Sequence, residues 1–158
     1  MISQRTLLHY SKNYNAKNKQ GWTALQYAAR AGNNDILNIL LDFGGKVNSR
    51  IKGPAVDYRF SGNTPLINAA RFGKAKTVSV LLARGANVNM ASASKNTALM
   101  EGARSGSLRI VAELLEHGAD KNAKNDKNCT AECVVWHNSP RNAPRKRISN
   151  FIRNYRGY

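Results

Sequence analysis

Acidic residues are scarce in this 158-residue chain: nine Asp and Glu stand against 25 Lys and Arg, a formal net charge of +16 at pH 7. Such an excess favours polyanionic partners, which include nucleic acids, acidic proteins and anionic membrane surfaces, and says nothing about the fold. Cysteine is also scarce. Cys129 and Cys133 are too few for the disulfide framework of a small secreted domain. We therefore expect an intracellular protein with buried, inert thiols.

Long apolar runs are absent as well. No stretch approaches the roughly 18 apolar residues of a membrane span, and the N-terminal fifteen residues lack the apolar segment of a secretory signal. We expect a soluble monomer without a membrane span. Delivery into a host cell by a specialised secretion apparatus stays open, because it would leave no mark in this sequence.

Catalytic motifs are missing too. The chain has no Gly-rich phosphate loop, His-Glu-x-x-His zinc helix or nucleophile elbow. We expect no enzyme and no cofactor. The one cluster worth weighing is Cys129, Cys133 and His137, spaced four and four, which would share one face of a continuous helix and suit zinc. Because Cys129 precedes the helix start expected at Thr130 and a fourth ligand is not apparent, we expect no metal.

What the chain does have is a period of 33 residues. Thr-x-Leu triplets begin at Thr23, Thr64 and Thr97, a degraded copy begins at Thr130, and the last two intervals are both 33. Thr is a favourable helix N-cap, and the Gly that follows each Ala-containing segment favours a helix end. A second apolar segment then ends at another Gly. Each unit therefore predicts two short helices that must stack on their neighbours to bury their apolar faces.

This unit, clearest in "TPLINAARFGKAKTVSVLLARGANVN", resembles the ankyrin repeat. The resemblance implies an all-α repeat solenoid of helix-turn-helix units joined by β-turn or hairpin fingers. It also gives the expected division of a single domain, 1–158: an N-terminal capping helix (1–15), repeats (16–48, 57–89 and 90–122), a finger insertion (49–56) and a divergent basic C-terminal cap (123–158).

Three departures from the repeat pattern predict local effects. Lys95 occupies a turn position held elsewhere by glycine, where a left-handed conformation would cost roughly 1 kcal/mol, so the turn at 92–96 should be the least regular. Gly102 replaces an Ala and should loosen its helix by ~1 kcal/mol. Glu132 stands where Leu is expected, in a terminal unit whose apolar stripe from Ile148 to Tyr155 can close the stack.

The interval from Thr23 to Thr64 is eight residues longer than the period. The extra residues fall in the finger between the first two repeats. There "AVDYRF" alternates, with Val56, Tyr58 and Phe60 on one side, and predicts a lengthened β-hairpin. A harmless surface decoration is the alternative, since loop insertions cost little. The aromatic and basic composition favours a contact element.

The resemblance further implies a concave groove lined by the fingers and by the first helix of each repeat. Arg recurs at one repeat position and predicts a ladder up this groove, although it could equally support helix ends. Exposed aromatic residues beside the ladder have the composition of a binding hot spot. The candidate partner-binding residues are Trp22, Arg30, Tyr58, Arg59, Phe60, Arg71, Phe72 and Arg104.

We therefore expect a non-catalytic module that binds an acidic protein segment. Nucleic-acid or other polyanion binding is a second hypothesis, and an ankyrin effector of an intracellular microbe acting on host proteins is a third. The segment Pro144-Arg145-Lys146-Arg147 can be a nuclear-import signal or the solvated face of the last helix.

Overall fold

The computed structural model describes residues 13–53, 56–138 and 144–157, so most of the capping helix expected at 1–15 lies outside the described residues. This part of the chain contains eight helices and no strand. The helices are α2 (Ala24–Ala31), α3 (Asn34–Asp42), α4 (Pro65–Arg71), α5 (Ala75–Ala83), α6 (Ala98–Ser105), α7 (Leu108–Glu116), α8 (Ala131–Asn138) and α9 (Arg145–Asn154).

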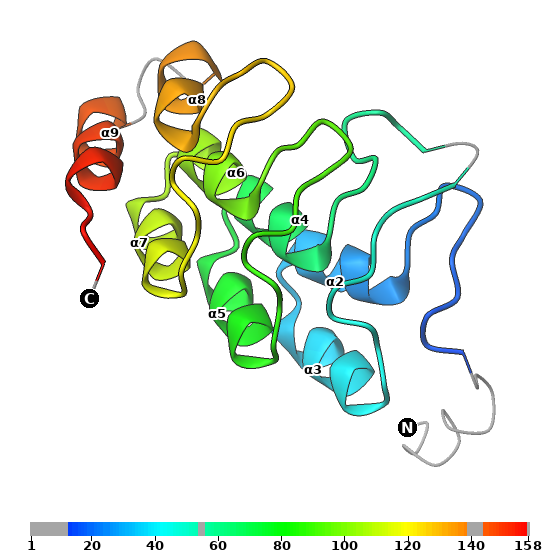
Figure 1. Ribbon diagram of the computed structural model, residues 1–158. Coiled ribbons are helices and arrows are strands. Elements are labelled where there is room, and N and C mark those ends of the chain that lie inside the picture. The colour runs from blue at the N-terminus through cyan, green and yellow to red at the C-terminus, as the bar shows by residue number, and fades with distance from the viewer. Residues whose placement is uncertain (1–12, 54–55, 139–143, 158) are drawn as a thin grey trace.

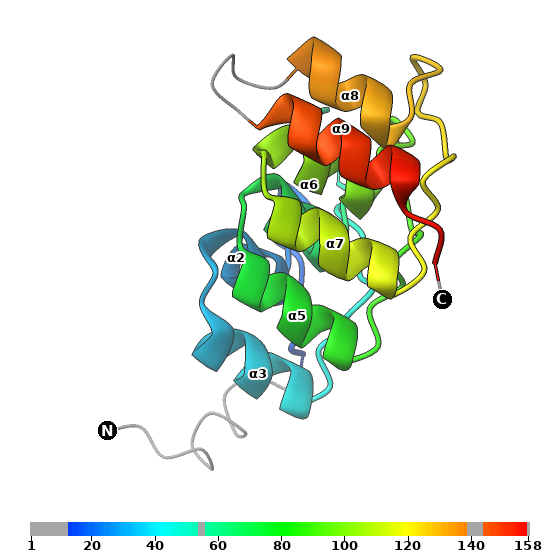
Figure 2. The same ribbon diagram turned by 90° about the vertical axis from the view of Figure 1, so that its left-hand side faces the viewer.

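The helices form two rows. In Figure 1, α2, α4, α6 and α8 follow one another in one row, and α3, α5, α7 and α9 follow one another in the second. Figure 2, turned by 90°, shows the second row in front. Each helix contacts its neighbours in its row and its partner in the helix pair. This stack of helix pairs confirms the all-α repeat fold that the period predicts.

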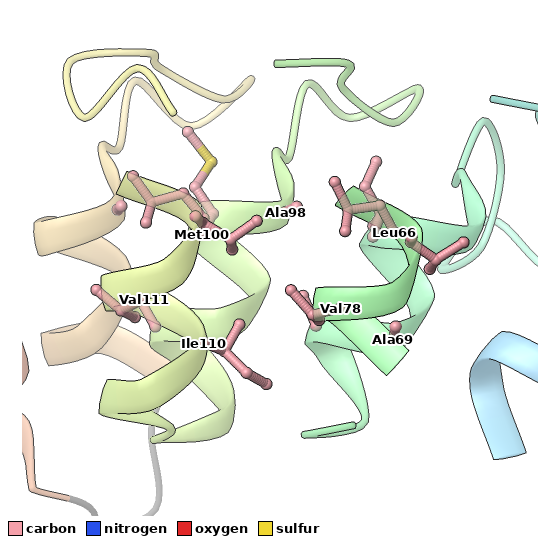
Figure 3. Packing of buried hydrophobic residues seen from close by; sticks show 14 of the residues in the cluster. Leu66, Ala69, Val78, Ala98, Met100, Ile110 and Val111 are labelled. Atoms are coloured by element: carbon pink, nitrogen blue, oxygen red, sulfur yellow. The ribbon is translucent and has the colours of Figure 1, made fainter. Parts of the chain in front are cut away.

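The repeated residues have the roles that their spacing predicts. The hydroxyls of Thr23, Thr64 and Thr97 each accept a hydrogen bond from the backbone N–H three residues later, which caps α2, α4 and α6. Small and branched apolar side chains then fill the space between the rows, as Figure 3 shows. The side chains labelled there are Leu66, Ala69, Val78, Ala98, Met100, Ile110 and Val111, and all are almost fully buried.

Gly102 in α6 has a packing role that the sequence alone does not reveal. A Cβ added at this position would lie 2.7 Å from Cγ2 of Ile110, in the paired helix α7. Ile110 is itself fully buried within the hydrophobic core. The glycine thus allows the close approach of α6 and α7, in place of the loosening expected from helix propensity.

Replacing Gly102 by Ala should therefore destabilise the protein, although Ala is the better helix former. Overpacking of a filled core costs roughly 1–3 kcal/mol, which exceeds the propensity gain of about 1 kcal/mol. We expect the variant to unfold at lower urea concentration than the wild type. Arg109→Ala on the paired helix α7, at an exposed position, is the control and should leave the midpoint almost unchanged. A more stable Gly102→Ala protein would contradict this account of the packing.

The turn at 92–96 is more regular than expected. Lys95 does adopt the left-handed conformation predicted for it, with φ = 58°. The Ser92 N–H nevertheless donates to the Asn96 carbonyl at 2.9 Å, and Ala91 and Thr97 form an antiparallel bridge beyond them. The expectation that this turn would be the least regular is wrong, because its backbone hydrogen bonds stabilise the finger despite the strained residue.

Asparagines that recur at the repeat period join neighbouring repeats. The Asn15 side chain accepts from the Lys46 N–H at 2.7 Å and donates to the Gly44 carbonyl at 3.1 Å. Asn89 repeats the pattern two units later, with the Asp120 N–H and the Gly118 carbonyl. These bonds satisfy backbone groups that the preceding helix leaves without partners.

The C-terminal unit closes the stack with α9. Ile148 and Ile152 are buried against α7 and α8. The departure of Glu132 from the repeat pattern has a structural reason, because the Glu132 carboxylate accepts hydrogen bonds from Arg153 and Ser149 of α9. The bond from Arg153, with a smaller effect from Ser149, holds the pKa of Glu132 below its usual value. A carboxylate in place of Leu therefore joins α8 to the terminal helix.

The finger insertion differs from the expected hairpin. It closes at its base, where the Ile51 N–H donates to the Asn63 carbonyl at 3.0 Å and the Gly62 N–H donates to the Ile51 carbonyl at 2.8 Å. Beyond the base, residues 58–62 form successive turns, so the strand predicted from the alternation is wrong. The Asp57 carboxylate accepts from the Arg59 N–H and bends the chain there. Two residues of the expected hairpin turn, Pro54 and Ala55, lie outside the described residues.

Candidate partner-binding groove

The finger packs onto the first repeat through an aromatic cluster, which consists of Trp22, Phe60 and Phe72. The Phe60 ring lies between the other two, with centroid distances of 5.2 Å to Trp22 and 6.3 Å to Phe72. The Arg30 guanidinium lies 5.0–5.7 Å from the three ring centroids. A cation held by three aromatic rings stabilises this junction through cation–π contacts.

Trp22 is buried, in contrast to the exposed contact residue that we expected. Only 5% of it is accessible, because Phe60 of the finger and Tyr27 of α2 cover its ring. The burial of Trp22 could not be predicted from the repeat pattern, because it depends on how the insertion folds back onto the first repeat. Trp22 therefore anchors the finger, and Tyr58 at 81% exposure is the aromatic residue that the finger presents to solvent.

Two of the three ladder arginines share a buried carboxylate. Glu101 of α6 is 1% exposed, and its carboxylate oxygens accept from Arg104 at 2.7 and 2.8 Å. Arg71 of the preceding repeat lies 4.0 Å from the same carboxylate. Sequence reasoning missed Glu101. The available signal was an acidic residue at a repeat position occupied by Tyr27 and Asn68 in the earlier units.

The arginine ladder is consequently not a uniform row of free cations. Arg30 lies in the aromatic cluster, Arg104 is bound by Glu101, and Arg71 joins the two regions. The Arg71 guanidinium lies 5.1 Å from the Phe60 centroid and donates to the Arg59 carbonyl at 3.1 Å. Its side chain, like that of Arg104, remains one quarter exposed. Both guanidinium groups are thus held in place on side chains that remain partly exposed.

A groove of about 830 Å³ runs from the finger to the C-terminal unit. Four cationic side chains and one carboxylate line it, so it retains a positive excess. Tyr58 lies at its finger end, and Ser92, Ser94 and Asn96 of the next finger also line it. The charged lining residues are Arg59, Arg71, Arg104, Lys127 and Asp126.

Only some of the candidate partner-binding residues line this groove. Tyr58, Arg59, Arg71 and Arg104 line it, whereas Arg30 and Phe72 line a separate depression of about 420 Å³ with Tyr27. Arg59 is paired with Asp57, and this hydrogen bond holds the pKa of Asp57 below its usual value. Arg59 therefore presents less net charge to a partner than Arg71 does.

Some basic residues outside the groove have structural roles. The Lys17 ammonium donates to the Arg50 carbonyl at 2.8 Å, and the Arg50 guanidinium donates to the Ala91 carbonyl at 2.7 Å. Lys121 donates to the Tyr155 carbonyl at 2.7 Å, where the end of α9 favours a cation. A fraction of the net charge is thus used to join repeats.

The basic segment Pro144-Arg145-Lys146-Arg147 enters α9 directly. Lys146 and Arg147 are exposed in its first turns, on the terminal unit and away from the groove. Among the described residues, no helix combines the length and the apolar character that a bilayer span requires.

The expectation of two inert thiols is wrong for this structure, because Cys129 and Cys133 form a disulfide. Cys129 lies outside α8, as expected from the Thr130 cap, whose hydroxyl accepts from the Cys133 N–H at 3.4 Å. The loop before the cap nevertheless returns Cys129 to the helix. His137 Nδ1 lies 3.7 Å from Cys133 Sγ, so the sulfur and imidazole groups meet at the C-terminal end of the groove.

Comparisons with known proteins agree with this architecture. The family pattern described as ankyrin repeats (3 copies) matches residues 47–125, and the one described as ankyrin repeats (many copies) matches residues 5–41. An IkB-like protein of African swine fever virus is 36% identical over 77 residues, which is 49% of this chain and 30% of that protein. The match thus spans less than a third of the viral relative. Such repeats are generally non-catalytic modules for protein interaction. The chain belongs to the ankyrin-repeat family.

Proposed function

We propose that this protein is a non-catalytic interaction module that binds an acidic protein segment in the groove as a monomer. The single observation that supports this function best is the positive groove, with Arg71 and Arg104 held at one edge by Glu101 and with Tyr58 exposed at one end. Fixed guanidinium groups lose little side-chain entropy when they bind a carboxylate, and Tyr supplies apolar contact area.

The test is a titration with a fluorescent peptide rich in Glu and Leu, compared with the same peptide carrying Gln in place of Glu. Combining Tyr58→Ala with Arg71→Gln should weaken binding of the acidic peptide by about tenfold or more, the loss typical of a binding hot spot. Gln is chosen at position 71 because a new carboxylate there would face Glu101.

The matched control is Arg147→Gln, which removes the same charge from an exposed position on α9. Its affinity for the peptide should stay near that of the wild type. Equal losses in the two proteins would mean that the peptide responds to overall charge, and the groove would be the wrong site.

Polyanion binding is the second candidate, supported by the net charge of +16 and by the exposed basic turns of α9. The same titration with a DNA or RNA duplex, at about 50 and about 200 mM salt, separates the two functions, because binding to several phosphates weakens steeply with salt. Nucleic acid that binds more tightly than the acidic peptide at the higher salt would favour this candidate.

A microbial effector that acts on host proteins is the third candidate. The similarity to a viral protein is the observation that favours a search for the partner among host proteins.

A further inference from the structure

We propose that Cys129 and Cys133, once reduced, bind one Zn²⁺ ion together with His137 at the C-terminal end of the groove. The possible ligand atoms of these three residues all lie within 4.8 Å of one another. Thiolate and imidazole are the ligands that zinc prefers. Metal binding here needs no protein partner, so it can be tested whether or not the groove binds an acidic segment.

The local fold brings the three ligands together from two sides. Cys133 and His137 are four residues apart on α8 and therefore lie on one face of the helix. Cys129 is returned to that face by a tight loop, in which the Asn125 side chain accepts from the Cys129 N–H at 3.1 Å and the Asn125 N–H donates to the Cys129 carbonyl at 3.1 Å. This loop removes the objection raised by the position of Cys129 before the cap.

The distances suit a tetrahedral ion. Zn–S and Zn–N bonds of about 2.3 and 2.0–2.1 Å place the ligand atoms of such a site roughly 3.4–3.8 Å apart. Cys133 Sγ and His137 Nδ1 are already 3.7 Å apart. His137 Nδ1 also lies 3.1 Å from the Cys133 carbonyl oxygen, and it must give up this contact and any proton it carries to bind zinc. The Cα atoms of the two cysteines are 5.3 Å apart, so side-chain rotation can separate the sulfurs without moving the backbone far.

The metal and the disulfide exclude each other, because zinc binds thiolates. A dithiol reductant supplies two electrons and two protons to the Cys129–Cys133 bond; its own two sulfurs become a disulfide and both cysteines become thiols. Zinc then displaces one proton from each thiol as the Zn–S bonds form. The groove end thus has an oxidised form without the ion and a reduced form that holds it.

A tetrahedral ion held by these three ligands would leave its fourth coordination position to water. The three ligands line the groove with Lys127 and Asp126, and the described residues include no fourth His or Cys in the cluster. An open position distinguishes this site from closed structural zinc sites, which use four protein ligands.

The experiment is a titration of the full reduced chain with Co²⁺, in the absence of oxygen and after removal of bound metal. One equivalent should produce the visible bands of tetrahedral cobalt and the thiolate-to-cobalt charge-transfer band, and Zn²⁺ should abolish both. His137→Asn should weaken binding at least about tenfold, and Cys133→Ser should remove the charge-transfer intensity of one thiolate.

His117→Asn is the matched control, because His117 is also exposed and its Nδ1 likewise lies near the carbonyl four residues earlier, at 2.8 Å. This variant should bind cobalt as the wild type does. His137 is exposed, so its replacement leaves the buried core intact and circular dichroism can verify the fold. The proposal is overturned by the absence of a tetrahedral spectrum, or by one that is unchanged in His137→Asn. It is also overturned if bound Zn²⁺ gives no protection when the reduced protein is treated with a disulfide-forming oxidant.

Discussion

Replacing Glu101 by Gln should lower the free energy of unfolding by about 3 kcal/mol. The carboxylate is 1% exposed and serves two guanidinium groups, so its neutral replacement leaves Arg71 and Arg104 facing each other without a counter-charge. Removing one partner of a buried ion pair costs about 3–5 kcal/mol, and the lower end applies because both arginines are one quarter exposed. Urea unfolding at low and high salt measures the change.

The control for this substitution is Asp57→Asn, which neutralises an acid paired with an exposed arginine. Its unfolding curve should match that of the wild type, because exposed ion pairs contribute little and because the Asn side-chain oxygen can still accept from the Arg59 N–H. A variant of unchanged stability would show that Glu101 does not hold the two arginines.

Replacing Trp22 by Ala should destabilise the protein by about 3 kcal/mol and release the finger. Large buried aromatic side chains typically cost 3–5 kcal/mol on truncation to Ala. Here the loss removes the ring against which Phe60 and Arg30 pack. We expect both a lower unfolding midpoint and faster proteolytic cleavage within residues 56–60 under native conditions.

The chain offers a matched control in its second tryptophan. Trp136 is 47% exposed, so Trp136→Ala should cost well under half as much and leave the finger protected. Each variant retains one tryptophan, and the fluorescence of this residue reports the environment of the site that was not substituted. Equal stability of the two variants, or an unchanged cleavage rate in Trp22→Ala, would contradict the anchoring role of Trp22.

Most of the fold could be predicted because its determinants are local and recur. Threonine caps, helix-ending glycines and apolar positions at helical spacing repeat at one interval, so each unit supports the assignment of the others. The left-handed conformation of Lys95 followed from the same register, since Lys95 occupies the turn position of Gly21 and Gly62. Gly102 was misinterpreted because helix propensity is a local property, whereas its role depends on Ile110 in the next helix.

The site was less predictable because its contacts cross between repeats and the insertion. The alternation in "AVDYRF" predicted a strand, but the side chain of Asp57 turns the backbone and brings Phe60 onto Trp22. The repeat register contained a further signal besides Glu101. Cys129, Cys133 and His137 fall at the positions of Asn96, Met100 and Arg104 one period earlier, and Asn96 and Arg104 line the groove.

The carboxylate of Glu101 also means that these repeats are not interchangeable building blocks. The second repeat has Asn68 at the corresponding position, where the amide accepts from Asn63 at 2.8 Å. An artificial array made by duplicating the second repeat would place two Arg71 side chains in succession with only neutral amides between them. Lengthening this protein by modular engineering would therefore require copies of the third repeat, so that each guanidinium keeps an anion within reach.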